Sequence, residues 1–444
     1  MSKSKTVRLV RPPMKGYTVG QLEDNVFAPI GLYLLASVLR KRFPGIDVKV
    51  VDGYNKSNDQ TIAEIGNPDI VGVTCGYWNY DNALPILEYS KSKGAQTVIG
   101  GPNMTHLARR TLTNRDFIDF AVVNDGEEAL PAIVEGVAGK NTPNLFYRDG
   151  NNVLESLVRR NSPLDTLFTL EDMSAEEMEK LKGHSVPVAG IRGCAKAEKE
   201  GPCDFCSICH PLSEMEQDLI WQQARILKSY GFRYLWEVGE TVFQSYLQKL
   251  LRTRPVDLED IQWKFYICAD LVNEDVAELL RDLGTKEVQI GIETPNDEIL
   301  QNVGKKARLD DIIRAVDLVS SHGIDIHATA MYGLTGETPE SAKRTYEFIR
   351  SLVAQYPQIK KITTSHALPF FGNKMFRRLA KNPEYAKEYP GDLNKDDSFD
   401  YRALTRIYTK HFTSVDFDQM ETLVQKTRAL MDGRGYGTSF DLVN

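Results

Sequence analysis

Four of the chain's six cysteines lie close together, at Cys194, Cys203, Cys206 and Cys209. Three thiolates on one irregular loop can bind three irons of a [4Fe–4S] cluster and leave the fourth iron open for another ligand. A structural zinc ion needs four ligands, commonly two Cys-x-x-Cys pairs about 15–20 residues apart. The last three cysteines are too crowded for two such pairs. The spacing therefore favours iron–sulfur ligation, with a four-thiolate zinc site as the alternative and a redox Cys-x-x-Cys pair as the weaker one.

The cysteines follow the first of six predicted strand–helix units. The strands are predicted at 186–193, 232–240, 261–270, 287–294, 324–333 and 360–370. The intervening helices are predicted at 218–231, 244–253, 273–284, 309–323 and 341–357. Six units predict a full or partial (β/α) barrel over residues 186–380. In such barrels the reactive side chains lie at the carboxyl ends of the strands.

An open, doubly wound α/β domain is predicted for residues 1–140. Its strands are predicted at 5–10, 47–53, 69–75 and 96–101 and at the start of 120–137, with helices at 28–44 and 83–94. This alternation is typical of a Rossmann-like parallel sheet, which binds ligands at the carboxyl ends of its strands. Glycines fall at those ends, and glycine lets a backbone approach a bulky ligand closely. They can equally be turn residues.

The rest of the chain predicts a connector over 141–185 and a polar, helical C-terminal region over 381–444. The connector should contain a hairpin at 144–157 that turns at Asp149-Gly150. The chain has 444 residues, 42% of them hydrophobic, and a net charge of −7. It shows no apolar run near the ~20 residues of a membrane helix, no secretion signal and no basic segment for nucleic acid. We therefore expect a cytoplasmic protein without membrane or nucleic-acid partners.

With these motifs the sequence resembles the radical S-adenosylmethionine (SAM) enzymes. Arg192-Gly193-Cys194 at the first barrel strand, followed by Cys203-Asp204-Phe205-Cys206, carries the resemblance. The N-terminal domain resembles the cobalamin-binding domain fused to one branch of this superfamily. Further similar segments are APIGLYLLASVLR (28–40), VVDG (50–53), GGPNMTH (100–106), NDGEEAL (124–130), VGETVF (238–243), GIET (291–294), YGLTGET (332–338) and ALPFFGN (367–373).

The resemblance implies three groups of cofactor-binding residues. Cys194, Cys203 and Cys206 would bind a [4Fe–4S] cluster whose open iron takes the amino and carboxylate groups of SAM. The residues expected around SAM are Phe205, Glu240 (at its ammonium group), Glu293 (on its ribose side), Thr294, Gly333 and Gly336. The residues expected around cobalamin are Gly53, Gly76, Gly100, Gly101, Asn103, Gly126 and Glu127.

Three features depart from the family's usual pattern. Eight residues separate Cys194 from Cys203, which is more than usual, so Cys203, Cys206 and Cys209 form a rival ligand set. The loop 51–59 lacks the histidine that supplies a lower cobalt ligand in some cobalamin proteins. Asn103 stands where Gly-Gly-Pro is commonly followed by histidine. Some members of the family keep this domain as a scaffold that binds no cobalamin.

Three further side chains are weak catalytic candidates. Cys268 lies at a predicted strand end and could quench a radical, although cysteine is more often a buried core residue. His327 alternates with Ile326 on a predicted strand and could point into the barrel as a proton donor or substrate ligand. Tyr332 could line a substrate. For each of them, packing in the barrel core is the competing interpretation.

The first functional hypothesis is a cobalamin-dependent radical SAM C-methyltransferase acting on a small molecule. The second is a radical SAM dehydratase, epimerase or reductase whose cobalamin-type domain is only a scaffold. The third is a zinc-stabilised binding module without catalysis. The first two imply an external electron donor such as flavodoxin or ferredoxin, and the sequence identifies no other protein partner.

Overall fold

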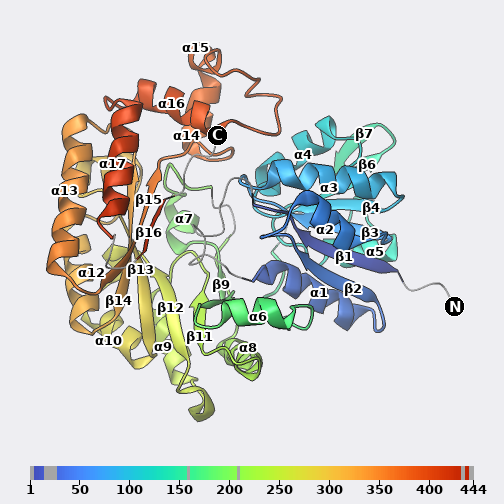
Figure 1. Cartoon of the computed structure of the whole chain (residues 1–444), viewed down its shortest axis with the longest axis horizontal. Helices are drawn as coiled ribbons and strands as arrows, with labels where there is room; N and C mark the ends of the chain where they lie inside the picture. Colours follow the sequence, from blue (N-terminus) through green and yellow to red (C-terminus); the bar gives the residue numbers. More distant parts are fainter. Residues whose placement is uncertain (1–4, 15–27, 158–160, 208–210, 432–435, 440–444) are drawn as a thin grey trace. The chain divides into compact units, whose positions relative to one another are not determined.

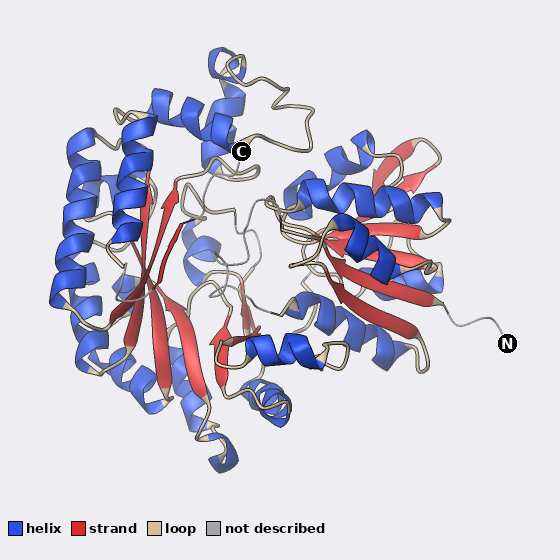
Figure 2. Ribbon diagram, in the orientation of Figure 1, coloured by secondary structure: helices blue, strands red, loops and turns tan. Residues whose placement is uncertain are grey.

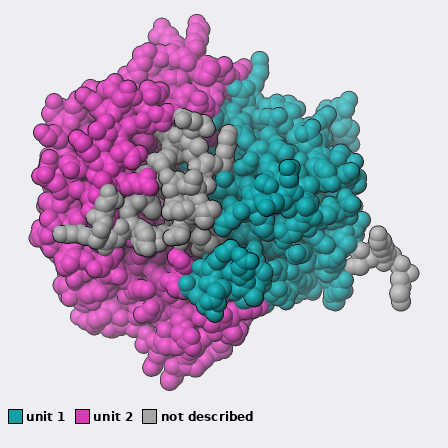
Figure 3. All heavy atoms as spheres, in the orientation of Figure 1, with its two compact units in different colours: residues 1–182, 394–399 teal, residues 183–393, 400–444 magenta. Residues whose placement is uncertain are grey.

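A computed structural model describes residues 5–14, 28–157, 161–207, 211–431 and 436–439. The chain forms two compact units (Figure 3). Unit 1 contains residues 1–182 and 394–399, and unit 2 contains residues 183–393 and 400–444. The two units are described separately below.

Unit 1 is built on a seven-stranded sheet with the order β2-β1-β3-β4-β5-β6-β7. Its strands are β1 (Thr6–Arg11), β2 (Asp47–Asp52), β3 (Ile70–Thr74), β4 (Gln96–Gly100), β5 (Phe120–Val122), β6 (Leu145–Asp149) and β7 (Asn152–Glu155). The first five are parallel, and β6 and β7 form the predicted antiparallel hairpin. This order is that of a doubly wound sheet whose direction reverses between β1 and β3.

Helices cover both faces of this sheet (Figure 2). They are α1 (Ile30–Arg42), α2 (Asn58–Ile65), α3 (Tyr80–Ser92), α4 (Met104–Asn114) and α5 (Ala129–Glu135). A further helix of unit 1, α6 (Ala175–Leu181), follows the hairpin in the chain. The apolar strand β3 is almost wholly buried, as expected for a central strand of a parallel sheet. Helix α1 buries Leu32, Ala36 and Leu39, which lie on one face at helical spacing.

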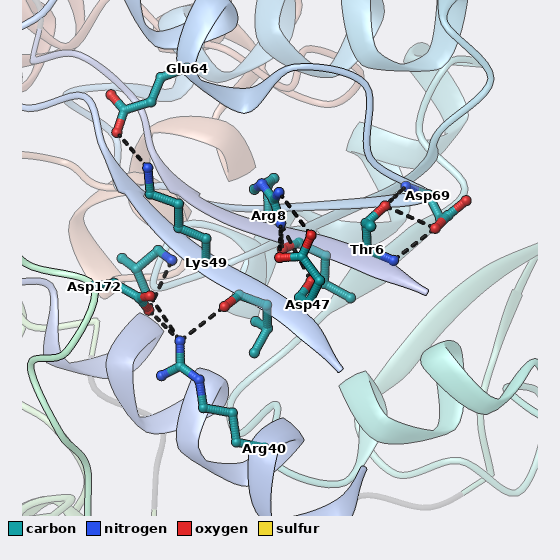
Figure 4. A network of polar contacts seen from close by, with 11 residues as sticks. Thr6, Arg8, Arg40, Asp47, Lys49, Glu64, Asp69 and Asp172 are labelled. Carbon is teal, nitrogen blue, oxygen red and sulfur yellow. Dashed lines mark hydrogen bonds and ion pairs between the residues drawn. The ribbon is translucent and has the colours of Figure 1, made fainter. Parts of the chain in front are cut away.

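Polar contacts tie the edge of this sheet together (Figure 4). Arg8 of β1 donates to Asp47 at the start of β2 at 3.0 Å. Arg40 of α1 donates to both carboxylate oxygens of Asp172, at 2.8 and 2.7 Å, and Asp172 also accepts the amide of Val50. Residues after the hairpin are thus anchored to the first two strands of unit 1.

A short segment from late in the chain also belongs to unit 1. Residues 394–399 bring in Asp397, which is 3% exposed. Its carboxylate accepts hydrogen bonds from Tyr80 Oη at 2.8 Å and from Arg115 Nε at 3.0 Å. A buried charge requires such partners, so this segment is an integral part of the unit 1 core.

Unit 2 contains a second seven-stranded sheet, with the order β16-β15-β14-β13-β12-β11-β8. Its strands are β8 (Val186–Val188), β11 (Tyr234–Glu237), β12 (Gln262–Ile267), β13 (Thr285–Glu293), β14 (Asp325–Tyr332), β15 (Ile359–His366) and β16 (Tyr436–Ser439). All neighbouring strands are parallel. Six strands in sequential order confirm the partial (β/α)6 barrel. Strand β16 lies in the region predicted to be helical and was not anticipated.

Helices pack against one face of this sheet (Figure 1). They include α8 (Gln217–Ser229), α9 (Gln244–Arg252), α10 (Glu274–Asp282), α12 (Leu309–Ser321), α13 (Pro339–Gln355) and α17 (Phe417–Ala429). Trp263 of β12 meets Trp221 of α8 on this face, with ring centroids 5.6 Å apart. Alternate strand residues point to the opposite face, so a second set of side chains lines the interior of the partial barrel.

The remaining elements of unit 2 are short or lie in the C-terminal region. They are β9 (Ile191–Arg192), β10 (Ser213–Glu214), α7 (Ala195–Glu200), α11 (Asp297–Asn302), α14 (Lys374–Lys381), α15 (Pro383–Ala386) and α16 (Tyr401–Phe412), with 3-10 turns at Val256–Leu258 and Ala269–Leu271. The predicted helical C-terminal region is thus confirmed for α15 to α17, whereas α14 begins within the segment predicted to be part of the barrel. None of the helices that the structure describes is long and apolar enough to span a bilayer.

Candidate active site

The cysteine loop leaves the first strands of the partial barrel. Cys194 follows β9 and caps the short helix α7, which ends at Gly201. Cys203 then donates to the carbonyl of Gly304 at 3.6 Å, and the amide of Cys206 donates to the carbonyl of Cys203 at 3.0 Å. The thiols of Cys194, Cys203 and Cys206 are each partly exposed. Cys209 lies outside the described residues.

Burial and nearby charges act in opposite directions on the thiol of Cys203 in this loop. Burial raises the pKa of Cys203, and the ammonium groups of Lys196 and Lys305 oppose that rise. Nearby cations favour the thiolate, which is the form that binds metal. Within the described residues, no three Cys, His, Asp or Glu side chains already converge as a metal site. The donor set nevertheless fits a thiolate-bound cluster, which would require the thiols to turn toward one centre.

The strand β11 ends in a buried carboxyl group that the sequence did not single out. Glu237 is fully buried and accepts hydrogen bonds from the amides of Gly190 and Gly239, both at 3.0 Å. Glu240, which was expected to end this strand, lies three residues farther on and is exposed. β11 ends at Glu237, whose carboxyl group binds the turn after β8. Glu240 is exposed and stays a candidate for SAM.

The end of β13 carries a buried ion pair. Glu293 has a φ of +58°, an uncommon backbone conformation for a residue other than glycine. Its carboxylate is paired with Lys305 and accepts from Thr329 Oγ1 at 3.1 Å. Lys305 also donates to the carbonyl of Gly291 at 2.7 Å. Positive φ at a non-glycine residue is typical of functional sites, because the surrounding contacts must hold it.

The neighbouring Thr294 points away from this site. Its hydroxyl lies 2.9 Å from that of Thr345 in α13, and both residues are fully buried. The structure therefore places Thr294 against the outer helices, on the opposite side of the chain from Glu293. Glu293 and Thr294 were both expected around SAM, but their side chains point to opposite sides of the chain.

The loop after β14 has the two glycines expected to line SAM. Gly333 and Gly336 both have a φ of +84°, which favours glycine. The amide of Gly333 donates to Glu337 at 2.6 Å, while Glu337 Oε1 has no hydrogen-bond partner among the described residues. Burial raises the pKa of Glu337 to about 8. The amide of Gly336 donates to the carbonyl of Phe412 at 2.8 Å, so the C-terminal helices hold this loop.

The remaining candidates in unit 2 fall into two environments. Cys268 follows β12, its amide donates to Thr241 Oγ1 at 3.2 Å, and burial raises the pKa of its thiol to about 11. The charges of Lys305 and Cys194 act on this thiol, so it lies in the same region as the cysteine loop. The ring of Tyr332, by contrast, is fully buried among residues of α17, and its hydroxyl lies 2.7 Å from Thr427 Oγ1. Tyr332 is part of the core between sheet and helices.

His327 points into the barrel, as its alternation predicted. Its Nε2 lies 2.7 Å from Thr363 Oγ1, and its Nδ1 lies 3.8 Å from Glu287. Glu287 pairs with Lys264 at 2.6 Å and with Lys361 at 3.2 Å. Burial and the two lysines lower the pKa of His327 to about 3, so its ring is neutral.

A set of polar interior residues was missed by the sequence reasoning, apart from Tyr266, which could line a substrate or fill the barrel. They alternate along successive strands and share the interior face: Lys264 and Tyr266 of β12, Glu287 and Gln289 of β13, Thr329 of β14, and Lys361 and Thr363 of β15. Their period of two along each strand was the available signal. An interior face of this composition suits a polar substrate better than an apolar one.

In unit 1 the candidate residues for cobalamin follow the carboxyl ends of the parallel strands. Gly53 follows β2, Gly76 follows β3, Gly100 ends β4 and precedes Gly101 and Asn103, and Gly126 and Glu127 follow β5. This edge, at the reversal between β1 and β3, is where doubly wound sheets bind ligands. At Gly101 a side chain would lie 2.6 Å from Thr74 Oγ1, so this glycine is also required by the protein's own packing.

Asp52, at the end of β2, is held by the protein itself. Arg11 Nε donates to its carboxylate at 2.7 Å, and the amide of Tyr54 donates at 3.0 Å. The Arg11 guanidinium also lies over the Tyr54 ring, 4.6 Å from its centroid. The sheet edge suits a bulky ligand, but the loop 51–59 offers no imidazole to a cobalt ion.

Comparison with known proteins gives two family matches. Residues 188–349 match the model of the radical SAM superfamily, and residues 24–134 match that of the B12 binding domain. An uncharacterized methyltransferase of Pyrococcus horikoshii is 25% identical over 95% of this chain and 91% of its own length. The bacteriochlorophyllide d C-12(1)-methyltransferase of Chlorobaculum tepidum is 23% identical over 78% of this chain and 73% of its own length.

A solved structure shares the fold of nearly the whole chain. The radical SAM methyltransferase TsrM from Kitasatospora setae, with cobalamin and a [4Fe–4S] cluster bound, superposes with a TM-score of 0.70. The similarity covers 99% of this chain and 92% of TsrM, at 17% identity. The two domain matches, their order and this fold lead to one conclusion. The chain belongs to the radical SAM superfamily, in the branch that carries an N-terminal B12-binding domain.

Proposed function

We propose that the chain is a cobalamin-dependent radical SAM methyltransferase that methylates a carbon atom of a small molecule. The observation that carries this proposal is the presence of both domains in one chain with three cysteines on the loop after β9. The methyltransferase names of the relatives from Pyrococcus and Chlorobaculum support it. When bound, the cluster supplies the electron for SAM cleavage and the cobalamin carries the methyl group.

In this proposal each part of the protein has a defined task. Cys194, Cys203 and Cys206 bind the cluster. The exposed Glu240 accepts hydrogen bonds from the SAM ammonium group, because a carboxylate makes strong charge-assisted bonds to it. Glu293 holds the ribose side of SAM while Lys305 neutralises its charge in the protein interior. The SAM-binding loop that starts at Gly333 and the aromatic ring of Phe205 complete the SAM environment.

The substrate class follows from the interior of the partial barrel. Its side chains include Gln289, Thr329 and Thr363, which are partly exposed and can form hydrogen bonds. We therefore propose a small polar acceptor molecule. An external electron donor of the flavodoxin or ferredoxin type would reduce the cluster.

A second function is favoured by a specific observation in unit 1. Asp52 is engaged by Arg11, and the loop 51–59 has no histidine. A domain that binds no cobalamin would leave an enzyme that uses the 5′-deoxyadenosyl radical alone, for dehydration, reduction or epimerisation. A zinc-stabilised, non-catalytic module is the third candidate.

One set of measurements distinguishes the three functions. The protein is purified without oxygen, reconstituted with iron, sulfide and hydroxocobalamin, desalted and assayed for metals. The methyltransferase predicts about four irons and one cobalt per chain, with transfer of a labelled SAM methyl group to an acceptor. Iron without cobalt, together with 5′-deoxyadenosine formation, supports the second function. Bound zinc without iron supports the third and contradicts both enzymes.

A further inference from the structure

The cysteine loop carries a buried acidic residue between two of its cysteines. Asp204 lies between Cys203 and Phe205 and is 3% exposed. Its carboxylate is paired with Lys374 at 3.1 Å and with Arg378, both on α14. A buried carboxylate is stable only when such partners neutralise it, so α14 is fixed to the cysteine loop.

The backbone of the cysteine loop is held by the same helix. The amide of Lys374 donates to the carbonyl of Asp204 at 3.2 Å. The side chain of Asn373, which caps α14, donates to the carbonyl of Phe205 at 3.2 Å. Two backbone carbonyls and one carboxylate of the loop therefore depend on the first two turns of α14.

Arg378 extends these contacts to a second loop. Its Nη1 donates to Thr335 Oγ1 at 3.1 Å and to Tyr408 Oη at 3.1 Å. Thr335 lies between Gly333 and Gly336 in the loop after β14, and its hydroxyl is 2.8 Å from that of Tyr408 in α16. In the part of the chain that the structure describes, Lys374 is bonded to Asp204 alone, whereas Arg378 reaches both loops.

We infer that Arg378 is a positioning residue that fixes the cysteine loop relative to the loop after β14. The inference rests on the proposed function, in which the first loop binds the cluster and the second lines SAM. A guanidinium is suited to this role because its planar set of donors can serve two partners at once. Fixing the two loops would hold SAM in the orientation that the open iron requires. Tyr408 gives α16 of the C-terminal region a part in this arrangement.

The test compares two neighbouring cations of α14 in the full-length, reconstituted enzyme. The variants are Arg378→Met and Lys374→Met. Each removes one positive charge beside Asp204, but only the first also removes a hydrogen bond to Thr335. Iron content, the electron paramagnetic resonance (EPR) spectrum of the reduced cluster with and without SAM, and the KM and kcat of SAM cleavage are measured.

Arg378→Met should retain wild-type iron while the KM for SAM rises about tenfold or more, because misplaced groups lose productive geometry. The change that SAM produces in the cluster's EPR spectrum should then need correspondingly more SAM. Lys374→Met should retain both the iron and the wild-type KM. Thr335→Val removes a single hydroxyl group and keeps the ion pair between Asp204 and Arg378. It should also raise the KM for SAM.

Three results would overturn the inference. They are an unchanged KM in Arg378→Met, equal changes in Arg378→Met and Lys374→Met, and an unchanged KM in Thr335→Val. If Arg378→Met does not fold, the Thr335→Val result decides alone. Failure of the proposed function is separate, because the wild-type protein would then bind no iron or cleave no SAM.

Discussion

Tyr246 donates a hydrogen bond of 2.8 Å to Glu237, and both side chains are fully buried behind the exposed Glu240. The same carboxyl group accepts the amides of Gly190 and Ile191 at the turn after β8. It therefore joins the first two strands of the partial barrel at the point where the cysteine loop begins. Glu237 thus supports the start of the cysteine loop from within the core, whereas Glu240 is exposed.

Replacing Glu237 should destabilise the barrel. Glu237→Met leaves the amides of Gly190, Ile191 and Gly239 without an acceptor, and each unsatisfied buried group costs about 1–3 kcal/mol. Urea unfolding at pH 6 should show a loss of more than about 2 kcal/mol. Glu237→Gln keeps an acceptor oxygen and should lose much less; equal losses in the two variants would show that the hydrogen bonds are unimportant.

The same residue should give the stability a pH dependence. Burial raises the pKa of Glu237 to about 7, although its hydrogen bonds oppose the rise. The folded protein then holds a proton that the unfolded chain releases above its ordinary pKa. This contribution to stability is present below that ordinary value and is lost as the pH rises to about 7. Glu237→Gln cannot titrate, so its unfolding midpoint should fall less than that of wild type between pH 5 and 7.

Glu240 should matter for SAM and not for folding. Glu240→Gln removes the negative charge proposed to face the SAM ammonium group, while the residue lies outside the buried contacts of Glu237. The iron content and the thermal midpoint should match wild type, and the Kd for SAM, measured by equilibrium dialysis, should rise. An unchanged Kd would remove Glu240 from the proposed site.

Two adjacent lysines allow a controlled test of the buried ion pair. Lys305→Met leaves the Glu293 carboxylate buried without its cation, and breaking such a pair costs about 3–5 kcal/mol. Lys306 pairs with Glu200 at the surface, where both side chains are about half exposed. Lys306→Met should therefore change the free energy of unfolding little, because water and salt screen an exposed ion pair. Similar losses in the two variants, measured by urea unfolding, would contradict the assignment of Lys305.

His327 should contribute to sensitivity to acid. Its pKa is lowered to about 3 by burial and by Lys264 and Lys361, with Glu287 opposing. Between pH 6.5 and 3 the unfolded chain therefore binds a proton that the folded protein does not. The free energy of unfolding consequently decreases as the pH is lowered through this range. His327→Gln should reduce this slope between pH 6 and 5, by up to about 1.4 kcal/mol per pH unit. Thr363→Val removes the hydrogen bond alone and should keep the slope.

The cysteine variants decide the ligand set. Replacing Cys203 or Cys206 by alanine should abolish SAM cleavage, because two thiolates hold a cubane poorly. Cys194→Ala should do the same, whereas Cys209→Ala should keep about four irons per chain. If the iron is lost in Cys209→Ala and kept in Cys194→Ala, the rival set of Cys203, Cys206 and Cys209 is correct.

Most strands and the two fold classes followed from the sequence because local patterns determine them. Apolar runs such as that of β3 and the alternation of strands and helices predicted both parallel sheets. Strand β16 was missed because its pairing with β15 depends on a distant part of the chain. The helices α2 and α4 were also not predicted, although the buried residues of α4, such as Met104, Leu107 and Ala108, have helical spacing.

The site was predictable only where a motif carries it. The cysteines stood out by spacing, whereas Lys305 and Arg378 are ordinary surface-type residues in the sequence. Their roles arise from contacts with Glu293 and Asp204, which are 12 and 174 positions away along the chain. Tyr332 lies an even number of residues from Ile326 on β14, so the alternation that turns His327 inward also directs Tyr332 toward the helices.

The return of residues 394–399 to unit 1 limits how this protein can be recombined with its relatives. A fragment that ends at residue 182 lacks Asp397, so Tyr80 and Arg115 lose their shared carboxylate. A chimera made with a single junction after residue 182 would combine helices α3 and α4 of one protein with the segment 394–399 of another. Modular exchange therefore needs two grafts, and the boundary between the units cannot be a single point in the gene.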